Sequence, residues 1–147
     1  MVEFPKKREL KQILNITVGN ERPQLCEMMS GDEILEIRKV IREIPIADSV
    51  MDYALSIVVA THPEGDGAPE VVKKYVTAGA SPRAAQAIIK TARARALMEG
   101  RYNVSFDDID YVAFPALRHR LITNFEAIAD NMSADMIIKK IMEELKQ

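Results

Sequence analysis

The chain has 147 residues, of which 48% are hydrophobic and 29% charged, and its formal net charge is −2. This length suits one domain, or one domain with a small satellite, and the composition excludes a disordered chain. The longest apolar run, 54–60, is much shorter than the ~20 residues that cross a bilayer, and the charged N-terminus does not resemble a secretory signal. With Cys26 as its one cysteine, the sequence favours a cytoplasmic protein without disulfides or membrane contact.

Helical periodicity recurs along the chain and the alternation typical of strands is scarce, so we expect an all-α bundle of six to seven helices. The first helix covers about 5–17. A capping box at Ser30 and Glu33 begins the second helix, and Pro45 ends it. The apolar residues of this second helix fall on one stripe, which consists of Ile34, Ile37, Val40, Ile41 and Ile44.

A third helix is expected to begin at Asp48 or Ser49 and to end before Pro63. The run 62–69 is rich in residues that favour turns, so it is a loop. The side chains of the third helix that we expect to face inward are Tyr53, Ala54, Ile57 and Val58.

A long central helix follows, with Ser81 as its N-cap, Pro82 as its first residue and Gly100 just beyond its end. Arg83 then lies where the helix dipole is already positive, which suggests that it meets an anion such as a phosphate. The alternative is an exposed arginine that pairs with a neighbouring carboxylate. The stripe that faces the core has mostly small side chains: Ala85, Ile88, Ile89, Ala92 and Ala96.

The last third of the chain contains three further helical segments. Ser105 begins a short helix, which we expect Pro115 to interrupt. A second piece holds Leu117 and Leu121. Ser133 caps the last helix, whose apolar stripe consists of Ile137, Ile138, Ile141, Met142 and Leu145.

Positive charge is concentrated in 73–101, where seven basic residues stand against Glu99, so this segment carries +6 and the remainder −8. The excess favours either an anionic partner or a solvated face that acidic neighbours balance. A second basic cluster is formed by Arg118, His119 and Arg120. It is either a phosphate or partner contact or the solvated side of a helix.

The residues of a catalytic site do not come together in the sequence. His62 and His119 lie far apart without a metal-binding motif, and Cys26 has no neighbouring histidine. No glycine is followed by lysine, so a phosphate-binding loop is missing. Aromatic residues are too few for base stacking, which argues against nucleic acid. We therefore expect no metal site, no cofactor and no enzymatic activity for this chain in isolation.

Four blocks of the sequence, in order and spacing, resemble the C-terminal lid of MoxR-type AAA+ ATPases. The resemblance is strong from about Ile34 to the end and weaker before it. The blocks are Tyr75–Ala84 (YVTAGASPRA), Ala94–Ala96 (ARA), Gly100–Ile109 (GRYNVSFDDI) and Leu117–Leu121 (LRHRL).

This resemblance implies a helical lid that follows a core domain with Walker A and Walker B motifs, which binds ATP and Mg²⁺. Family members form rings in which the lid meets its own core and neighbouring subunits. They act as chaperone-like maturation factors, with von Willebrand A domain proteins as frequent partners, as in methanol dehydrogenase assembly. It also implies that Arg83, at the helix start formed by Ser81 and Pro82, is the sensor 2 arginine that contacts the γ-phosphate of ATP.

The resemblance also divides the chain. Residues 1–29 correspond to a helix and linker that lead from the core, and 30–147 to the helical lid. Since the core is not part of the sequence, we expect a chain cut at the core–lid boundary, with ATP hydrolysis carried out by the longer parent. The alternative function is a helical protein-interaction or adaptor domain that uses the basic segment 73–101.

Overall fold

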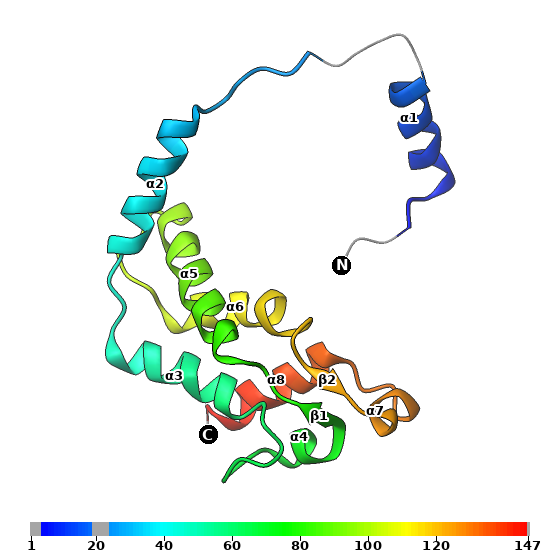
Figure 1. Cartoon of the computed structure of the whole chain (residues 1–147), viewed down its shortest axis with the longest axis vertical. Coiled ribbons are helices and arrows are strands. Elements are labelled where there is room, and N and C mark those ends of the chain that lie inside the picture. The colour runs from blue at the N-terminus through cyan, green and yellow to red at the C-terminus, as the bar shows by residue number, and fades with distance from the viewer. Residues whose placement is uncertain (1–3, 19–23, 147) are drawn as a thin grey trace. The chain divides into compact units, whose positions relative to one another are not determined.

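A computed structural model describes residues 4–18 and 24–146. The chain forms two compact units, Met1–Ile34 and Leu35–Gln147. Helix α1 (Lys7–Val18) lies in the first unit, and helix α2 (Gly31–Glu43) begins there and continues into the second (Figure 1). The boundary between units therefore falls within α2, a few residues beyond the predicted division at 29.

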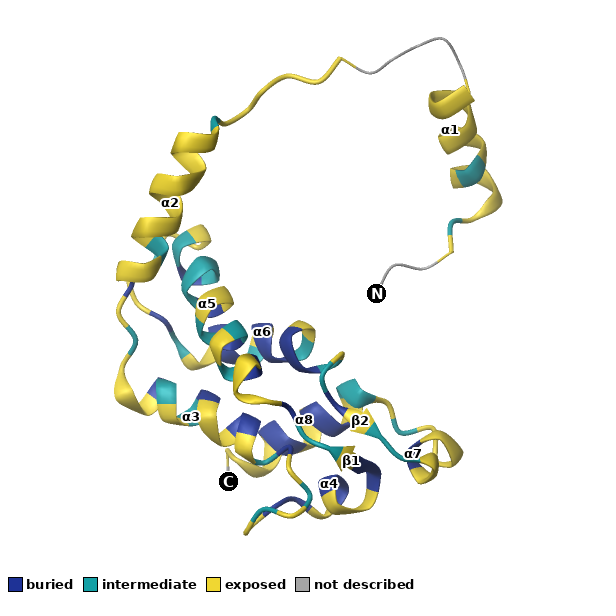
Figure 2. Ribbon diagram, viewed as in Figure 1, coloured by how far each residue is buried: buried dark blue, intermediate teal, exposed yellow. Residues whose placement is uncertain are grey.

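Helix α2 begins as predicted and α1 begins at Lys7, slightly later than the predicted start at residue 5, but both helices bury little. The Ser30 amide donates to the Glu33 carboxylate at 2.7 Å and the Glu33 amide donates to the Ser30 hydroxyl at 3.2 Å, which confirms the capping box. None of the described residues of α1 or α2 is buried, and Figure 2 shows both helices almost entirely in the colour of exposed residues. Of the predicted stripe of α2, only Ile44, just beyond the helix, is buried.

The second unit contains the remaining helices and a small sheet. The described residues form eight helices in all, so the predicted fold class is confirmed and the predicted count of six to seven is low. The elements in chain order are α3 (Asp48–Val59), α4 (Glu70–Tyr75), β1 (Val76–Ala78), α5 (Pro82–Met98), α6 (Phe106–Leu117), β2 (Ile122–Thr123), α7 (Phe125–Ala129) and α8 (Ala134–Glu144).

Helix α5 is the central helix of this unit, because it packs against both α3 and α6. Its buried side chains recur every four residues and three of the four are alanines, so the neighbouring backbones approach closely. The four are Ala84, Ile88, Ala92 and Ala96. Ala85 and Ile89, which were predicted in this stripe, are only partly buried.

Helix α8 completes the core, where it packs against α4 and α6. Its buried side chains are Ile137, Ile138, Ile141 and Met142.

A two-stranded antiparallel sheet, absent from the prediction, joins two distant parts of the second unit. Val76 pairs with Thr123 and Ala78 with Ile122. Beyond β2, the Asn124 amide donates to the Tyr75 carbonyl at 3.0 Å, and its side chain accepts from the Ala127 amide to cap α7. These bonds tie the segment before α5 to the segment before α7.

Three predicted boundaries are wrong. Helix α3 takes Ala47 as its N-cap, and Asp48 lies in the first turn, where its charge suits the dipole. Helix α6 continues through Pro115 to Leu117, because a proline in the last turn removes only one backbone bond. Residues 118–120 form a turn rather than a further helix, and it leads directly into β2.

A buried carboxylate fixes the connection between α5 and α6. Asp108 is fully buried and accepts two bonds from the Arg101 guanidinium, at 2.7 and 2.6 Å. Arg95 adds an ion pair at 3.3 Å, and the Ser105 amide donates at 2.9 Å in a capping box. The Arg101 guanidinium, followed by the Ser105 amide and hydroxyl, holds the pKa of Asp108 at about 2.

We expect the substitution Asp108→Asn to lower the free energy of unfolding by about 2–3 kcal/mol at neutral pH, because it removes a buried charge bonded to partly exposed arginines. The pKa of Asp108 lies below its usual 3.8, so its contribution is present above that pH and is lost as the pH falls toward 2. Urea unfolding at pH 7 and at pH 3 measures both effects. The difference in the free energy of unfolding between wild type and variant should be smaller at pH 3 than at pH 7.

Asp135→Asn is the matched control, because Asp135 also accepts two bonds from an arginine but its side chain is 47% exposed. This substitution should cost less than about 1 kcal/mol. Equal losses for the two variants would contradict the role assigned to Asp108.

Candidate functional site

The start of α5 presents Arg83 to solvent. Ser81 is the N-cap with φ −67° and ψ 167°, and Pro82 occupies the first helical position, as predicted. The Ser81 hydroxyl accepts no capping bond, and the Ala84 amide bonds to the Ser81 carbonyl at 2.8 Å. Arg83 is exposed, and its side chain has no hydrogen-bond or ion-pair partner among residues 4–18 and 24–146. Its guanidinium is therefore available to an anion from outside this part of the chain.

Most of the cations in the basic segment have partners inside the fold. Lys73 pairs with Glu70 and Lys74 with Asp130, while Arg95 and Arg101 share Asp108. The Tyr75 hydroxyl and then Lys74 lower the pKa of Asp130, which keeps it charged beside the lysine. Four of the seven cations that give the segment its +6 charge are thereby compensated locally.

The three remaining cations, Arg83, Lys90 and Arg93, all belong to α5. Arg83 and Lys90 are exposed and lie seven residues apart, so they share one face of the helix. Arg93 is half-buried, and its Nε atom is buried without a hydrogen-bond partner in the described structure. The positive charge that remains open to a partner is thus concentrated on the outer side of α5.

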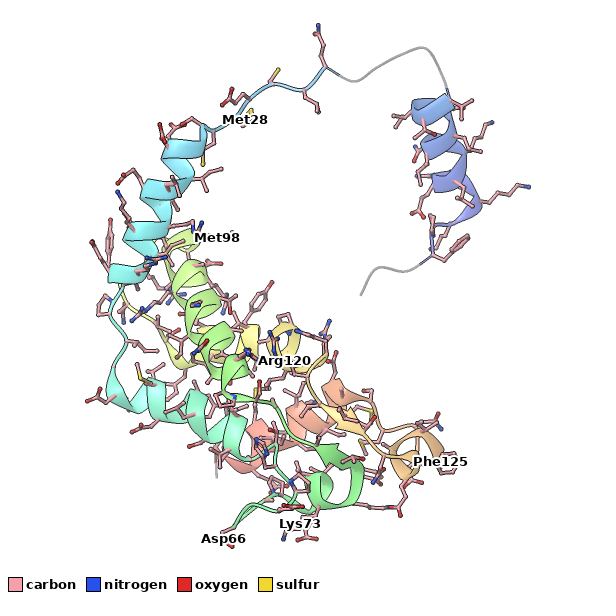
Figure 3. All side chains as sticks on the ribbon, in the orientation of Figure 1. Met28, Asp66, Lys73, Met98, Arg120 and Phe125 are labelled. Atoms are coloured by element: carbon pink, nitrogen blue, oxygen red, sulfur yellow. The ribbon has the colours of Figure 1, made fainter. Side chains whose placement is uncertain are left out.

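The second basic cluster lies in the turn that follows α6, where Figure 3 labels Arg120. Arg118 binds Asp135 with two bonds, at 3.0 and 2.9 Å. Arg120 donates to the Ala116 carbonyl at 2.5 Å and lies beside the His119 ring. Within the described residues, no hydrogen bond or ion pair joins this cluster to Arg83. A phosphate or partner contact of these three residues stays a prediction.

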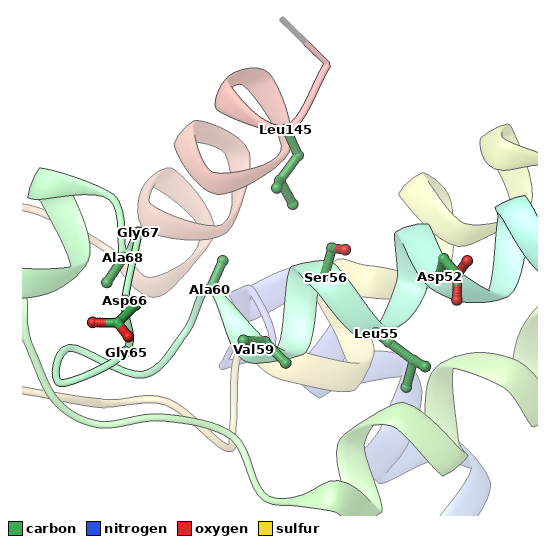
Figure 4. A pocket seen from close by; sticks show the side chains of 10 residues that line it. All are labelled: Asp52, Leu55, Ser56, Val59, Ala60, Gly65, Asp66, Gly67, Ala68 and Leu145. Carbon is green, nitrogen blue, oxygen red and sulfur yellow. The ribbon is translucent and has the colours of Figure 1, made fainter.

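A pocket beside α3 does not suit a phosphate group. It has a volume of about 390 Å³ and lies between α3, the loop 65–68 and Leu145 (Figure 4). Its charged lining residues are Asp52 and Asp66, which would repel an anion. Apolar side chains, including Leu55 and Val59, form much of the remaining lining. This pocket therefore has an acidic and apolar lining, unlike the basic start of α5.

Two residues that the sequence did not single out for this site hold the segment before α5. The Thr61 hydroxyl accepts from the Ala80 amide at 2.9 Å, and His62 Nε2 lies 3.1 Å from the Ala80 carbonyl. These contacts join residues 18 and 19 positions apart, across a loop, so periodicity carries no signal for them. Their effect is to attach the start of α5 to the end of α3.

Neither a metal site nor a membrane span is found in the part of the chain that the structure describes. No group of three or more histidine, cysteine or carboxylate side chains there is arranged to hold a metal ion. The described helices are all too short or too polar to cross a bilayer. Cys26, in the stretch before α2, is exposed.

Known proteins resemble this chain over nearly its whole length. The AAA lid domain family matches residues 69–141. Over 143 residues the chain is 33% identical to Chaperone MoxR1 of Mycobacterium tuberculosis (strain ATCC 25618 / H37Rv). The matched region covers 97% of this chain and 37% of that protein. It is 27% identical over 146 residues to the uncharacterized protein YeaC of Bacillus subtilis (strain 168). That match covers 97% of this chain and 42% of YeaC.

A solved structure supports the same relationship. The crystal structure of a candidate ATPase from Cytophaga hutchinsonii ATCC 33406 matches with a TM-score of 0.81 and 32% identity, over 97% of this chain and 43% of that one. The chain therefore spans less than half the length of each of these relatives. The GASPRA start of α5 and the turn 118–120 both lie inside the family match. The chain belongs to the MoxR-type AAA+ family and contains its AAA lid domain.

Proposed function

We propose that this lid acts with an ATP-binding core and that Arg83 is its sensor 2 residue, which contacts the γ-phosphate of bound ATP. The observation that carries the proposal is the exposed guanidinium of Arg83, which has no partner among the described residues, at the start of α5 within the AAA lid match. The core would bind ATP and Mg²⁺, and the relatives extend well beyond the part that this chain matches.

The start of α5 offers two kinds of donor to a phosphate oxygen. The Arg83 guanidinium supplies charge and a planar pair of N–H groups, and its backbone amide points out of the first turn. Pro82 has no N–H and holds its own φ near that of a helix, while Ser81 leaves its hydroxyl unused. A phosphate that arrives there meets donors that are already oriented, so binding requires little rearrangement.

An arginine on the lid also links the bound nucleotide to the position of the lid. Charge attraction between Arg83 and a γ-phosphate favours a closed arrangement of lid and core, and loss of that phosphate weakens it. We propose that the full-length protein uses this motion in the cytoplasm as a ring-forming, chaperone-like ATPase. Its clients would be protein complexes such as methanol dehydrogenase, with von Willebrand A domain proteins as partners.

The alternative function is an adaptor that binds through the basic segment 73–101. The internal ion pairs of Lys73, Lys74, Arg95 and Arg101 argue against it, because these side chains are already engaged. The outer side of α5 retains Arg83 and Lys90 for an acidic protein surface. Such a contact is compatible with the lid function and does not replace it.

Arg83→Ala in the full-length protein should lower ATP turnover by at least about tenfold, because it removes a charged group that contacts the transferred phosphoryl group. Steady-state hydrolysis and nucleotide binding are measured on the same preparations. Lys90→Ala is the matched control, since it removes a cation from the same helix face two turns away and should leave turnover unchanged. Wild-type turnover in the Arg83 variant would exclude the sensor role.

The 147-residue chain should not bind duplex DNA, because its formal net charge is −2 and most cations of its basic segment are paired. Fluorescence anisotropy of a labelled duplex at low salt measures this. Tight binding that falls steeply with added salt would instead favour the adaptor function.

A further inference from the structure

We propose that Thr61 and His62 are positioning residues that fix the direction of Arg83 toward its phosphate. This role rests on the sensor function proposed above for Arg83, and it names the residues that would orient the Arg83 side chain. Both residues follow the end of α3, whereas Arg83 lies in the first turn of α5, so the proposed contact joins two helices that are separated in sequence.

The peptide groups of Ala80 are held from both sides. The buried Thr61 hydroxyl accepts from the Ala80 amide at 2.9 Å and donates to the Val58 carbonyl at 2.6 Å. His62 Nε2 donates to the Ala80 carbonyl at 3.1 Å, because a carbonyl can only accept. Ala80 itself is fully buried. In the described structure, these two are the side-chain hydrogen bonds made to residues 79–83.

Gly79 lets the His62 ring approach the backbone. A Cβ atom at this position would lie 2.7 Å from the Thr61 carbonyl oxygen and 2.8 Å from His62 Cγ and Nδ1. These distances are too short for any side chain, so the close approach requires glycine. The ring is therefore packed against the strand-to-helix connection as well as bonded to it.

Little freedom remains between this contact and Arg83. Ala80 is followed by the Ser81 N-cap and then by Pro82, whose ring fixes its φ angle. A shift of the Ala80 peptide would thus be passed through Ser81 and Pro82 to the backbone at Arg83. The guanidinium lies at the end of a long side chain, so a small rotation at the backbone displaces it considerably.

The test uses ATP turnover of the full-length protein with His62→Phe, which keeps a ring against Gly79 but removes the donor. We expect kcat/KM for ATP to fall about three- to tenfold, as for the loss of one hydrogen bond, while circular dichroism and thermal unfolding stay close to wild type. His62→Gln retains an N–H donor and should restore turnover to within about twofold. Glu64→Gln, on the same loop, is the control that should change nothing.

A double-mutant cycle with Arg83→Ala separates positioning from a structural role. If His62 acts through Arg83, His62→Phe lowers turnover in the wild type and has no further effect in the Arg83→Ala background. An equal loss in both backgrounds, or no loss in either, overturns the positioning role alone. Wild-type turnover of Arg83→Ala overturns the proposed function instead.

A measurement on the unsubstituted chain covers the case in which a variant does not fold. The bond to the Ala80 carbonyl requires the tautomer of neutral His62 that carries its proton on Nε2. The nitrogen chemical shifts of ¹⁵N-labelled His62 at alkaline pH report the tautomer, and we expect protonated Nε2. A proton on Nδ1 would overturn the proposal.

Discussion

Close packing along one face of α5 is the constraint on which the rest of the lid depends. Ala84, Ala92 and Ala96 are fully buried, and each has only a methyl side chain. The backbones of α3 and α6 can therefore both approach this helix closely. A larger side chain at any of these positions would force the neighbouring helices apart. Because α5 is held along its buried length, its first turn has a defined place in the second unit, and any group on that turn is held with it.

The distribution of charge follows from the same arrangement. Cations in α4 and at the C-terminal end of α5 meet acids from other elements: Lys74 meets Asp130, and Arg95 and Arg101 meet Asp108. On the outer face of α5, Arg83 and Lys90 are exposed and have no ion-pair or side-chain hydrogen-bond partner in the described residues. A local charge excess in the sequence is therefore a poor guide to a binding surface until the internal pairs are subtracted.

Local signals in the sequence predicted the long elements well. The capping residues Ser30 and Ser133 and the box at Ser105 lie where helices begin, because capping depends on residues only three apart. Periodicity likewise identified Ile88, Ala92 and Ala96 as core positions of α5. Helix physics alone leaves Arg83 open between an anion site and a surface ion pair, and the resemblance of GASPRA to the family favours the anion site.

What the sequence did not reveal depends on contacts between distant segments or on very short elements. Strands β1 and β2 have three and two residues, too few to show an alternation, and their pairing spans the whole of α5 and α6. Helix α7 has only five residues, too few to show a helical periodicity, so it was missed as well. The bonds from Thr61 and His62 to Ala80 follow from how a loop returns to a helix start, which no local pattern encodes.

The unused hydroxyl of Ser81 has a consequence for how this domain is studied. It accepts no bond from the first turn of α5, and the Arg83 side chain is equally free of bonds within the described residues. Neither side chain makes a hydrogen bond to another helix in the described residues, so conservative substitutions at both positions should leave the helix packing unchanged. The nucleotide contact proposed for Arg83 can therefore be tested with substitutions that leave the packed core of the second unit in place.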